Sequence, residues 1–450
     1  MKVLLIKKFQ KWYTKFQIST SPQMNLVWGF FLYTLAGFVL LSLPIFHKVD
    51  IPLLDNFFIS TSAISTTGLI TISLADSYNF FGQFIIMLLI QIGGIGYMTL
   101  TTYYIMFTTR KITNWHKKII GAEFTMPSTI KTNDFLKSVI IFTLVMETLG
   151  AICFFIAFKG NGMHSLQAIW YSIFHSVSTF CTAGFALFND SFMSYQNDVF
   201  VNLIISVLAI SGSLGFIVVT DIWYKLTGKC KSISFTSKII IYGFLLLLFF
   251  GTIITYVTEP HITEHAQHPL MKSFFQTMSA MTTVGFNTID MVHLSLPTLL
   301  LVTFLMYIGA SPSGTAGGMK ITTVTTVAAV LKSRILGQKK ITFLSRRIPI
   351  GRLYVATSTF ILYTSLIFLF TFLMAYTEKS SFENILFEVA SALGTVGLST
   401  GLTPHLSTLG KIFIIILMFV GRVGVLTFGF ALLAKRLGKE IKPIQEDVAV

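Results

Sequence analysis

Stretches of about twenty mostly apolar residues recur along the chain and are separated by short polar or basic segments. Roughly 20 apolar residues are enough for a helix to cross a bilayer. The pattern predicts an all-α polytopic membrane protein with eight transmembrane spans, near 25–46, 80–108, 136–158, 199–224, 239–257, 296–333, 353–375 and 409–434.

A short motif returns four times between these spans. It reads F-x-x-x-S-x-x-x-T-x-G-[LF] and begins at Phe58, Phe174, Phe275 and Phe387. Its glycines lie 116, 101 and 112 residues apart, at Gly68, Gly184, Gly285 and Gly397. Steps of four residues place the Phe and the Ser on one face of a short helix. We expect the glycine to end that helix, because the chain must turn there with permissive dihedral angles.

Each motif is too short and too polar to cross the membrane, so we expect it to enter and leave on one side. Two spans per motif return the chain to the same side, which predicts four pseudo-symmetric repeats of helix, re-entrant pore helix and helix around one central ion pore. We call these repeats 1 to 4, for residues 25–109, 135–225, 238–336 and 352–436. A cytoplasmic interfacial segment, 1–24, precedes them, and a cytoplasmic tail, 437–450, follows.

The second span of every repeat carries small residues 24 to 28 positions after the motif glycine, as in GGIG (93–96), GSLG (212–215) and GRVG (421–424). Small residues let helix backbones approach closely or keep a central cavity wide. Repeat 3 has the longer stretch 309–320, in which Pro312 and several glycines disfavour a helix. Non-helical backbone at membrane depth must be buried in protein or line a cavity.

We therefore predict a movable gate loop in repeat 3 alone, lying across the pore. The candidate gate residues are Gly309, Ala310, Ser311, Pro312, Ser313, Gly314, Thr315, Ala316, Gly317, Gly318, Lys320 and, in the last span, Arg422. Arg422 is expected to donate hydrogen bonds to loop carbonyls and to repel cations, although it could instead join helices. Lys320 could belong to the gate or extend to the interface. Glu147 is an intramembrane carboxylate, and a structural hydrogen bond is favoured over a direct functional role.

Composition agrees with a membrane protein, because 53% of residues are hydrophobic and 11% are charged, where a soluble chain has about a quarter charged. The net charge is +15, and of the 33 Lys and Arg, 26 lie in the two termini and in alternate loops. The positive-inside rule then places both termini in the cytoplasm. Because this asymmetry explains the basic excess, nucleic-acid binding is not expected. The three cysteines have no spacing typical of a disulfide framework or a zinc site.

The residues around each motif glycine are the candidate metal ligands. Four extended loops meeting at one axis would present rings of carbonyl oxygens to a dehydrated cation. These filter segments comprise Thr66, Thr67, Gly68, Leu69, Thr182, Ala183, Gly184, Phe185, Thr283, Val284, Gly285, Phe286, Thr395, Val396, Gly397 and Leu398. Thr-Val-Gly, in repeats 3 and 4, also occurs in the filter of potassium channels. The alternative is that the glycines only allow re-entrant helices to pack.

The four motifs, together with IQIGGIGYMT (90–99), GGMKITT (317–323) and FVGRVGVLTF (419–428), resemble the Trk/Ktr/HKT cation-transporter superfamily. The likeness is specifically to the membrane subunit of bacterial Ktr potassium uptake systems (KtrB/KtrD type) and covers nearly the whole chain. The second filter segment, Cys-Thr-Ala-Gly, departs from some relatives. Glycine at position 68 is associated in the family with potassium preference.

The resemblance implies a homodimer with one pore per subunit in the bacterial cell membrane, bound to a cytosolic RCK/KTN regulatory ring (KtrA/KtrC type). It implies potassium as the transported ion and stimulation by sodium, with no organic cofactor on this chain. The basic segment 331–347 is the expected docking surface, and contact with membrane lipid is its alternative role. A Trk-type potassium/sodium transporter subunit, and less plausibly a membrane enzyme or sensor, are the competing interpretations. The chain shows no clustered His, Asp, Glu or Cys that an enzyme would need.

Overall fold

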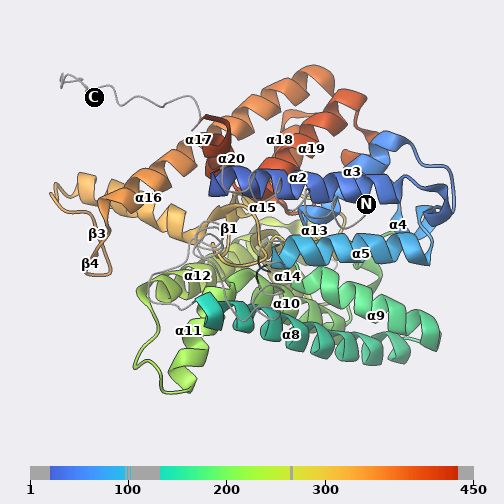
Figure 1. The fold of residues 1–450 in the computed structure, drawn as a ribbon, viewed down its shortest axis with the longest axis horizontal. Coiled ribbons are helices and arrows are strands. Elements are labelled where there is room, and N and C mark those ends of the chain that lie inside the picture. The colour runs from blue at the N-terminus through green and yellow to red at the C-terminus, as the bar shows by residue number, and fades with distance from the viewer. Residues whose placement is uncertain (1–20, 97–98, 100–101, 103–131, 264–266, 434–450) are drawn as a thin grey trace, which may run out of the picture.

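The computed structural model describes residues 21–96, 99, 102, 132–263 and 267–433 (Figure 1). The interfacial segment and the tail expected at the two ends, and much of the loop after repeat 1, fall almost entirely outside these residues. The described part is helical apart from two pairs of two-residue strands.

Within the described residues, four helices are long and apolar enough to cross a membrane, namely α2 (Pro22–Leu41), α8 (Thr132–Gly160), α12 (Phe235–Thr258) and α17 (Ile350–Thr377). They begin repeats 1 to 4 in order. Their outer faces carry exposed apolar side chains, such as Leu245 and Phe249 on α12 and Phe368 on α17. A soluble protein would not leave such continuous apolar faces in water, so these helices face lipid.

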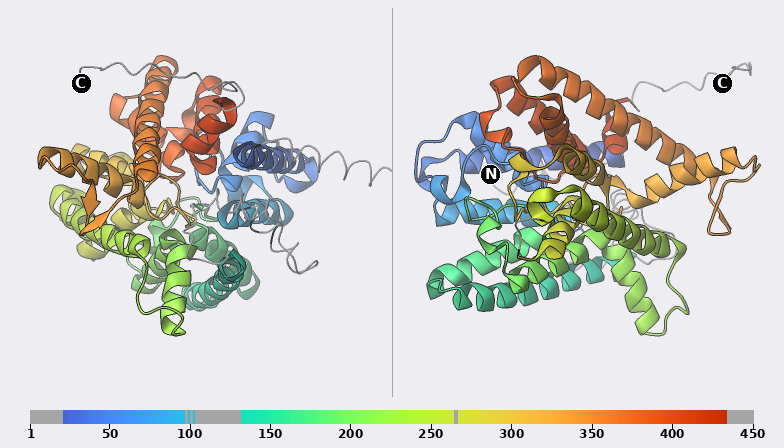
Figure 2. Two further views of the ribbon diagram at one scale, coloured as in Figure 1. Left: turned by 60° about the vertical axis from the view of Figure 1, so that its left-hand side comes forward. Right: turned by 180° about the vertical axis from the view of Figure 1, so that it is seen from behind.

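A short helix follows each long one and carries the motif, in α3 (Leu53–Ile64), α9 (Ser165–Phe180), α14 (Pro269–Thr282) and α18 (Phe382–Gly394). These pore helices are mostly buried, motif Phe and Ser included. In the left view of Figure 2, repeat 1 (blue), repeat 2 (teal to green), repeat 3 (lime to gold) and repeat 4 (orange to red) surround a common centre.

A second helix follows each pore helix, in α5 (Phe80–Ile95), α10 (Val199–Leu214), α15 (Leu296–Tyr307) and α19 (Thr408–Val423). Acidic side chains at the ends of the preceding long helices help to start two of them. Glu259 accepts the Ser295 N–H at 2.9 Å, and Glu378 accepts the Ser407 N–H at 3.0 Å. Carboxylates at these positions also suit the positive end of the helix dipole.

The second helices of repeats 2 and 4 are sharply bent, which the sequence did not predict. α10 meets α11 (Phe216–Leu226) at 90°, and α19 meets α20 (Val425–Leu433) at 95°. The spans expected at 199–224 and 409–434 are therefore broken at Gly215 (φ 84°) and Gly424 (φ 91°). Gly96, which ends α5, has φ 87°. The prediction that repeat 3 alone is interrupted was wrong, because glycine in this conformation ends the helix at the aligned position of the other repeats.

Repeat 3 has the longest interruption. α15 stops at Tyr307, strand β1 (Ile308–Gly309) pairs in parallel with β2 (Met319–Lys320), and α16 (Ile321–Ile335) then begins. A hairpin of β3 (Thr342–Phe343) and β4 (Arg346–Arg347) precedes α17. The remaining elements are η1 (Pro44–Phe46), α4 (Leu74–Ser77), η2 (Met193–Tyr195), α13 (Pro260–Thr263), η3 (Met291–His293) and η4 (Thr403–His405).

By length and composition, the described residues hold four full-length membrane helices, or six spans if each bent pair counts as one. The helices α5 and α15, which open the expected spans 80–108 and 296–333, are shorter. Most of the segment that follows α5 lies outside the described residues.

Candidate ion-conducting site

Each pore helix ends one or two residues before the motif threonine, not at the motif glycine. Thr66, Thr182, Thr283 and Thr395 have φ of 51°, 50°, 57° and 48°. This left-handed conformation is rare for a β-branched residue. The N–H of the next residue closes the helix by bonding to the motif serine carbonyl, as from Thr67 to Ser62 at 2.9 Å and from Val396 to Ser391 at 2.8 Å. The helix end is a Schellman turn in which threonine takes the usual place of glycine.

The motif serine also fixes the loop beyond the helix. In repeats 1 and 4 its hydroxyl accepts the N–H of the motif glycine at 3.1 Å, from Gly68 and from Gly397. In repeats 2 and 3 it donates instead to the carbonyl of the residue after the glycine, Phe185 at 2.8 Å and Phe286 at 2.5 Å. The periodic serine is thus the side chain that ties each filter segment to its own pore helix.

The four motif glycines form a closed ring of backbone contacts. A Cβ on Gly68 would meet the carbonyl oxygen of Ala183, and one on Gly184 would meet that of Val284, each within 2.6 Å. In the same way Gly285 abuts the Val396 carbonyl and Gly397 abuts the Thr67 carbonyl. Each repeat touches the next, and repeat 4 returns to repeat 1. The sequence-predicted filter segments are therefore brought together, and their glycines leave no room for a side chain.

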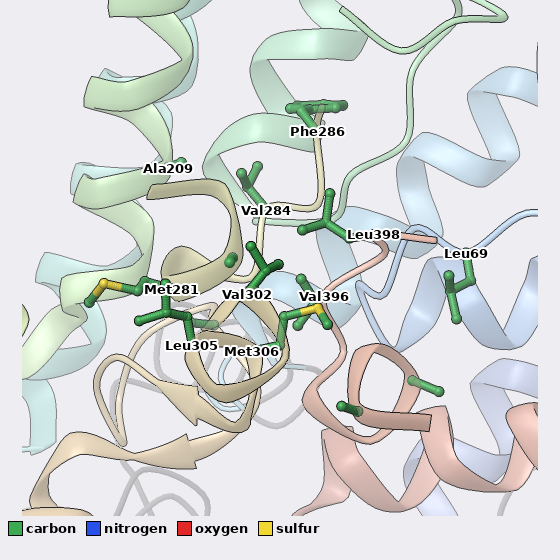
Figure 3. Close-up of a cluster of buried hydrophobic side chains, with 14 of the residues drawn as sticks. Leu69, Ala209, Met281, Val284, Phe286, Val302, Leu305, Met306, Val396 and Leu398 are labelled. Atoms are coloured by element: carbon green, nitrogen blue, oxygen red, sulfur yellow. The ribbon is translucent and has the colours of Figure 1, made fainter. Parts of the chain in front are cut away.

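Apolar side chains of the filter segments are packed into the surrounding core. Figure 3 shows Val284, Val396 and Leu398 close to Val302, Leu305 and Met306 of α15. Leu69 and Phe286 are also buried, each at 1% or less exposure. Because these side chains are held in the core, the backbone is what each segment can offer toward the axis of the ring.

The loop of repeat 3 touches the motif threonines of three filter segments, those of repeats 2, 3 and 4. The Thr315 hydroxyl accepts from the Thr182 hydroxyl at 3.1 Å and donates to the Phe180 carbonyl at 3.2 Å. The Gly317 N–H donates to the Thr283 hydroxyl at 3.0 Å. A Cβ on Gly317 would collide with the Thr395 hydroxyl. The loop therefore lies directly against the ends of three pore helices.

The loop is also fastened to the bend of repeat 2. Backbone hydrogen bonds join Ser311 to Ser213 at 3.2 Å, Thr315 to Gly212 at 3.1 Å, and Phe216 to Ser313 at 3.1 Å. Ser311, Ser313 and Thr315 are fully buried. In this structure backbone hydrogen bonds therefore hold the loop, which has few apolar side chains of its own.

Two basic side chains, Arg422 and Lys320, donate hydrogen bonds to carbonyls of the loop. The guanidinium of Arg422 donates to the carbonyls of Thr315, Gly93 and Gly94. It thereby connects repeat 4 to the loop and to repeat 1. The ammonium of Lys320 donates to the carbonyls of Ala316 (2.6 Å) and Gly317 (2.9 Å). Lys320 thus turns back into the loop, which contradicts the alternative in which it extends to the interface.

Two threonine hydroxyls at the ring differ from the others. Those of Thr182 and Thr283 bond to the repeat 3 loop, whereas the buried hydroxyls of Thr66 and Thr395 have no hydrogen-bond partner among the described residues. A buried polar atom without a partner is costly, so such a site suits water or a cation. These hydroxyls belong to the candidate metal ligands named from the sequence.

Glu147 lies on α8, next to the C-terminal part of the pore helix of repeat 2. Its carboxylate accepts from the Gln91 amide at 3.2 Å and from the Cys181 thiol at 3.8 Å. These partners come from α5 and from the end of α9, so Glu147 joins three elements. The hydrogen-bonded structural role favoured from the sequence matches this geometry.

In repeats 2, 3 and 4 the residue after the motif Phe bonds to the chain just beyond the filter segment, and sequence reasoning missed it. The His175 ring accepts the Leu187 N–H at 3.1 Å, and the Gln276 amide donates to the Thr288 hydroxyl at 3.0 Å. Glu388 accepts from the hydroxyls of Ser399 and Thr403. The sequence did carry a signal for this role, because the position directly after the motif Phe is polar in three of the four repeats.

Comparison with known proteins places this architecture in a family. A family described as "Cation transport protein" (TrkH) matches residues 8–435. The chain belongs to the TrkH cation transport family. It is a multi-pass membrane transporter and not an enzyme.

Curated relatives of the family match almost end to end. The "Potassium/sodium uptake protein NtpJ" of Enterococcus hirae is 35% identical over 92% of this chain and 93% of its own length. The "Ktr system potassium uptake protein B" of Bacillus subtilis is 34% identical over the same two shares. The crystal structure of the potassium transporter TrkH from Vibrio parahaemolyticus has a TM-score of 0.73 and 21% identity, covering 93% of this chain and 86% of that one. The last similarity concerns the fold alone.

Proposed function

We propose that this protein takes up potassium ions across the cytoplasmic membrane through a channel-like pore, with the filter segments as its selectivity filter. Four pseudo-symmetric repeats and eight spans would surround the pore. The closed ring of motif glycines carries this proposal, because it brings backbone from four distant parts of the chain to one axis. Carbonyl rings of this kind can replace the hydration shell of an alkali cation.

Potassium is the proposed ion, with sodium as a stimulating ion. Three relatives are named for potassium uptake, and another for potassium/sodium uptake. All four filter segments keep glycine at the ring position. A potassium/sodium transporter of the Trk type is the second candidate, and the name of the Enterococcus relative favours it.

The repeat 3 loop and Arg422 would form the gate. The loop touches three of the four filter segments, and the guanidinium adds a positive charge next to it. Opening would require the loop to release its bonds to the bend at Gly212–Phe216. A bistable loop of this kind, held by hydrogen bonds in one state, is a common gating element.

We further propose a homodimer, with both termini in the cytoplasm, that is regulated by a cytosolic RCK/KTN ring. Several relatives are named as parts of a Ktr system. The basic segment 331–347, which includes the exposed β3–β4 hairpin, would dock the ring.

Uptake of radioactive rubidium by a bacterium that lacks its own potassium uptake tests the transport function. Cells expressing the chain should accumulate rubidium, and excess potassium should compete more strongly than sodium. Gly285→Ser should abolish uptake, because its side chain would meet the Val396 carbonyl. Gly162→Ser is the matched control, since Gly162 also has positive φ but nothing within 4 Å. Equal competition by sodium would favour the second candidate, and full uptake by Gly285→Ser would contradict the proposed filter.

A further inference from the structure

A fully buried carboxylate, that of Glu388, lies next to the filter segment of repeat 4. Glu388 belongs to the pore helix α18 and has no exposed surface. The ion pairs among the described residues join Lys411 to Asp55 and His293 to Asp290, and none includes Glu388. A buried carboxylate is costly unless it is paired, hydrogen-bonded or bound to a metal ion. A negative charge at this position therefore needs a partner that the described residues do not supply.

Two hydroxyl groups surround one oxygen of this carboxylate. Glu388 Oε1 accepts from the Ser399 hydroxyl at 3.1 Å and from the Thr403 hydroxyl. The two hydroxyl oxygens lie 3.2 Å apart. The Gly401 N–H donates to Ser399 Oγ at 3.1 Å and holds the turn in this shape. The fold of a single repeat thus gathers three oxygen atoms in a small triangle.

The second carboxylate oxygen has different surroundings. Glu388 Oε2 is buried and has no hydrogen-bond partner among the described residues. The same holds for the hydroxyl of Thr400, which follows Ser399 in the chain. A proton on Oε2 would neutralise the charge, but within the described part of the chain it would meet no acceptor and would itself be an unsatisfied donor. A cation satisfies the oxygen and the charge together.

The ligand set indicates a small monovalent cation. Carboxylate and hydroxyl oxygens are hard ligands, which suit alkali and alkaline-earth ions. A single carboxylate balances one positive charge, and the described residues include no group of three or more His, Cys, Asp or Glu side chains that could hold a metal ion. Hydroxyl oxygens 3.2 Å apart suit sodium better than the larger potassium ion.

This group of oxygens lies within one repeat and not on the axis of the ring. All of its side chains come from repeat 4, whereas the ring is made by contacts between repeats. Ser399 is half-buried and Gly401 is exposed, so an ion can enter from the surface beyond the filter segment. An ion held here leaves the axis free for conduction.

We propose that Glu388, Ser399 and Thr403 bind a sodium ion, with Glu388 Oε2 as the charged ligand. The ion would fasten the turn at 399–403 to α18, and the filter residues 395–398 lie between these two attachments. Bound sodium would then hold the filter segment of repeat 4 in one shape without being transported. In this respect the proposal rests on the function proposed above, in which sodium stimulates potassium uptake, and it gives that effect a location.

Thermal unfolding of the purified protein in detergent tests the site without measuring transport. Potassium is kept constant and saturating, so that the filter is occupied, and choline is replaced stepwise by sodium at constant ionic strength. A ligand that binds only the folded state raises the melting temperature, so the wild-type protein should show a saturable rise with sodium. Glu388→Gln, which removes the charge and keeps the shape, should lose this rise. This variant should fold, because the aligned position in repeat 3 is Gln276, whose amide bonds to Thr288 at 3.0 Å.

Glu383→Gln is the matched control, since Glu383 lies in the first turn of the same helix, and it should keep the full response to sodium. Ser399→Ala keeps the charge and removes one ligand, so its half-maximal sodium concentration should rise several-fold. Equilibrium dialysis with radioactive sodium, again in saturating potassium, should show one bound ion per chain that Glu388→Gln lacks.

A response to sodium that survives in Glu388→Gln, or an unchanged half-maximal concentration in Ser399→Ala, would overturn the site. Wild-type protein whose melting temperature responds to pH but not to sodium would assign the carboxyl a proton and also overturn it. Because no flux is measured, these results are separate from that of the rubidium test. Sodium binding in a protein that takes up no rubidium would leave the site in place and contradict the transport function alone.

Discussion

At the scale of single residues, the ring depends on how little space lies between neighbouring backbones. The motif glycines have positive φ and abut the carbonyl of the next repeat, so a side chain is excluded for two independent reasons. The threonines before them also have positive φ but carry side chains, and two of their hydroxyls bond to the repeat 3 loop. Each filter segment therefore combines one position that requires glycine with one that uses a hydroxyl.

Gly68→Ser should lower the potassium-over-sodium ratio of uptake several-fold. Its Cβ would approach the Ala183 carbonyl to 2.5 Å, so the carbonyl ring between repeats 1 and 2 must widen or twist. The contacts at Gly285 and Gly397 are tighter, and the same change there should damage uptake more. Competition between rubidium and sodium measures the ratio, with Gly162→Ser as the control. An unchanged ratio in Gly68→Ser would remove this loop from the filter.

Sequence periodicity predicted the residues of the ring but not the geometry of their turns. The spacing of Phe and Ser located the pore helices, because it follows from the helical repeat itself. The left-handed threonines could not be predicted, since threonine has no intrinsic preference for that conformation. It is held there by backbone bonds such as that from Thr67 to Ser62. Polar partners such as Glu388 and Ser399 meet only after folding.

At the scale of elements, the second helices of repeats 1, 2 and 4 share a glycine that packs against the pore helix and a break that follows it. The sequence predicted the close packing but not the bends. Glycine alignments correctly located the close approaches, since Gly93, Gly212 and Gly421 abut the carbonyls of Ile64, Phe180 and Leu393 in their own pore helices. Hydropathy could not detect the bends, because α10 and α11 are apolar on both sides of Gly215. The bend of repeat 2 in turn supplies the backbone partners of the repeat 3 loop.

Arg422→Ala should raise cation flux and reduce its dependence on the proposed regulatory ring. The change removes the bonds to Thr315, Gly93 and Gly94, which loosens the loop. It also removes a repulsion of about 3 kcal/mol for a cation about 5 Å away at an effective dielectric near 20, before water screens it. Flux in liposomes with and without the ring measures both effects. Arg422→Lys, which keeps the charge, should lie between the wild type and Arg422→Ala. Lower flux in well-folded Arg422→Ala would make the arginine a support of the filter rather than part of a gate.

At the scale of the whole molecule, the basic face near the hairpin is proposed to hold the regulatory ring. Neutralising Lys339, Lys340, Arg346 and Arg347 together should weaken copurification of the ring at least tenfold, because steering and contact charges are both lost. The comparison variant neutralises four lysines at the end of α11, at the start of α12 and between them, and should have a smaller effect; they are Lys225, Lys229, Lys231 and Lys238. Undiminished copurification of the first variant would move the docking site elsewhere.

Closure of the four repeats into one ring depends on contacts between the last repeat and the first. At this seam the Lys411 ammonium on α19 pairs with the Asp55 carboxylate on α3 at 2.6 Å, and their side chains are 17% and 8% exposed. Because this pair is largely shielded from water, removing one partner leaves a charge without compensation, at a cost on the order of 3 kcal/mol. Lys411→Met should therefore lower the melting temperature of the purified protein, and Lys411→Met/Asp55→Leu should recover part of the loss. Lys379→Met is the control, since Lys379 is an exposed lysine at the end of α17, and it should change little.

The same seam also includes the contact between Gly397 and the Thr67 carbonyl in the filter ring. If α19 and α3 move apart, this contact should change, so Lys411→Met should reduce potassium-over-sodium selectivity as well as stability. If the double variant is no more stable than Lys411→Met, the pair does not close the ring, and the apolar contacts between α19 and α3 do.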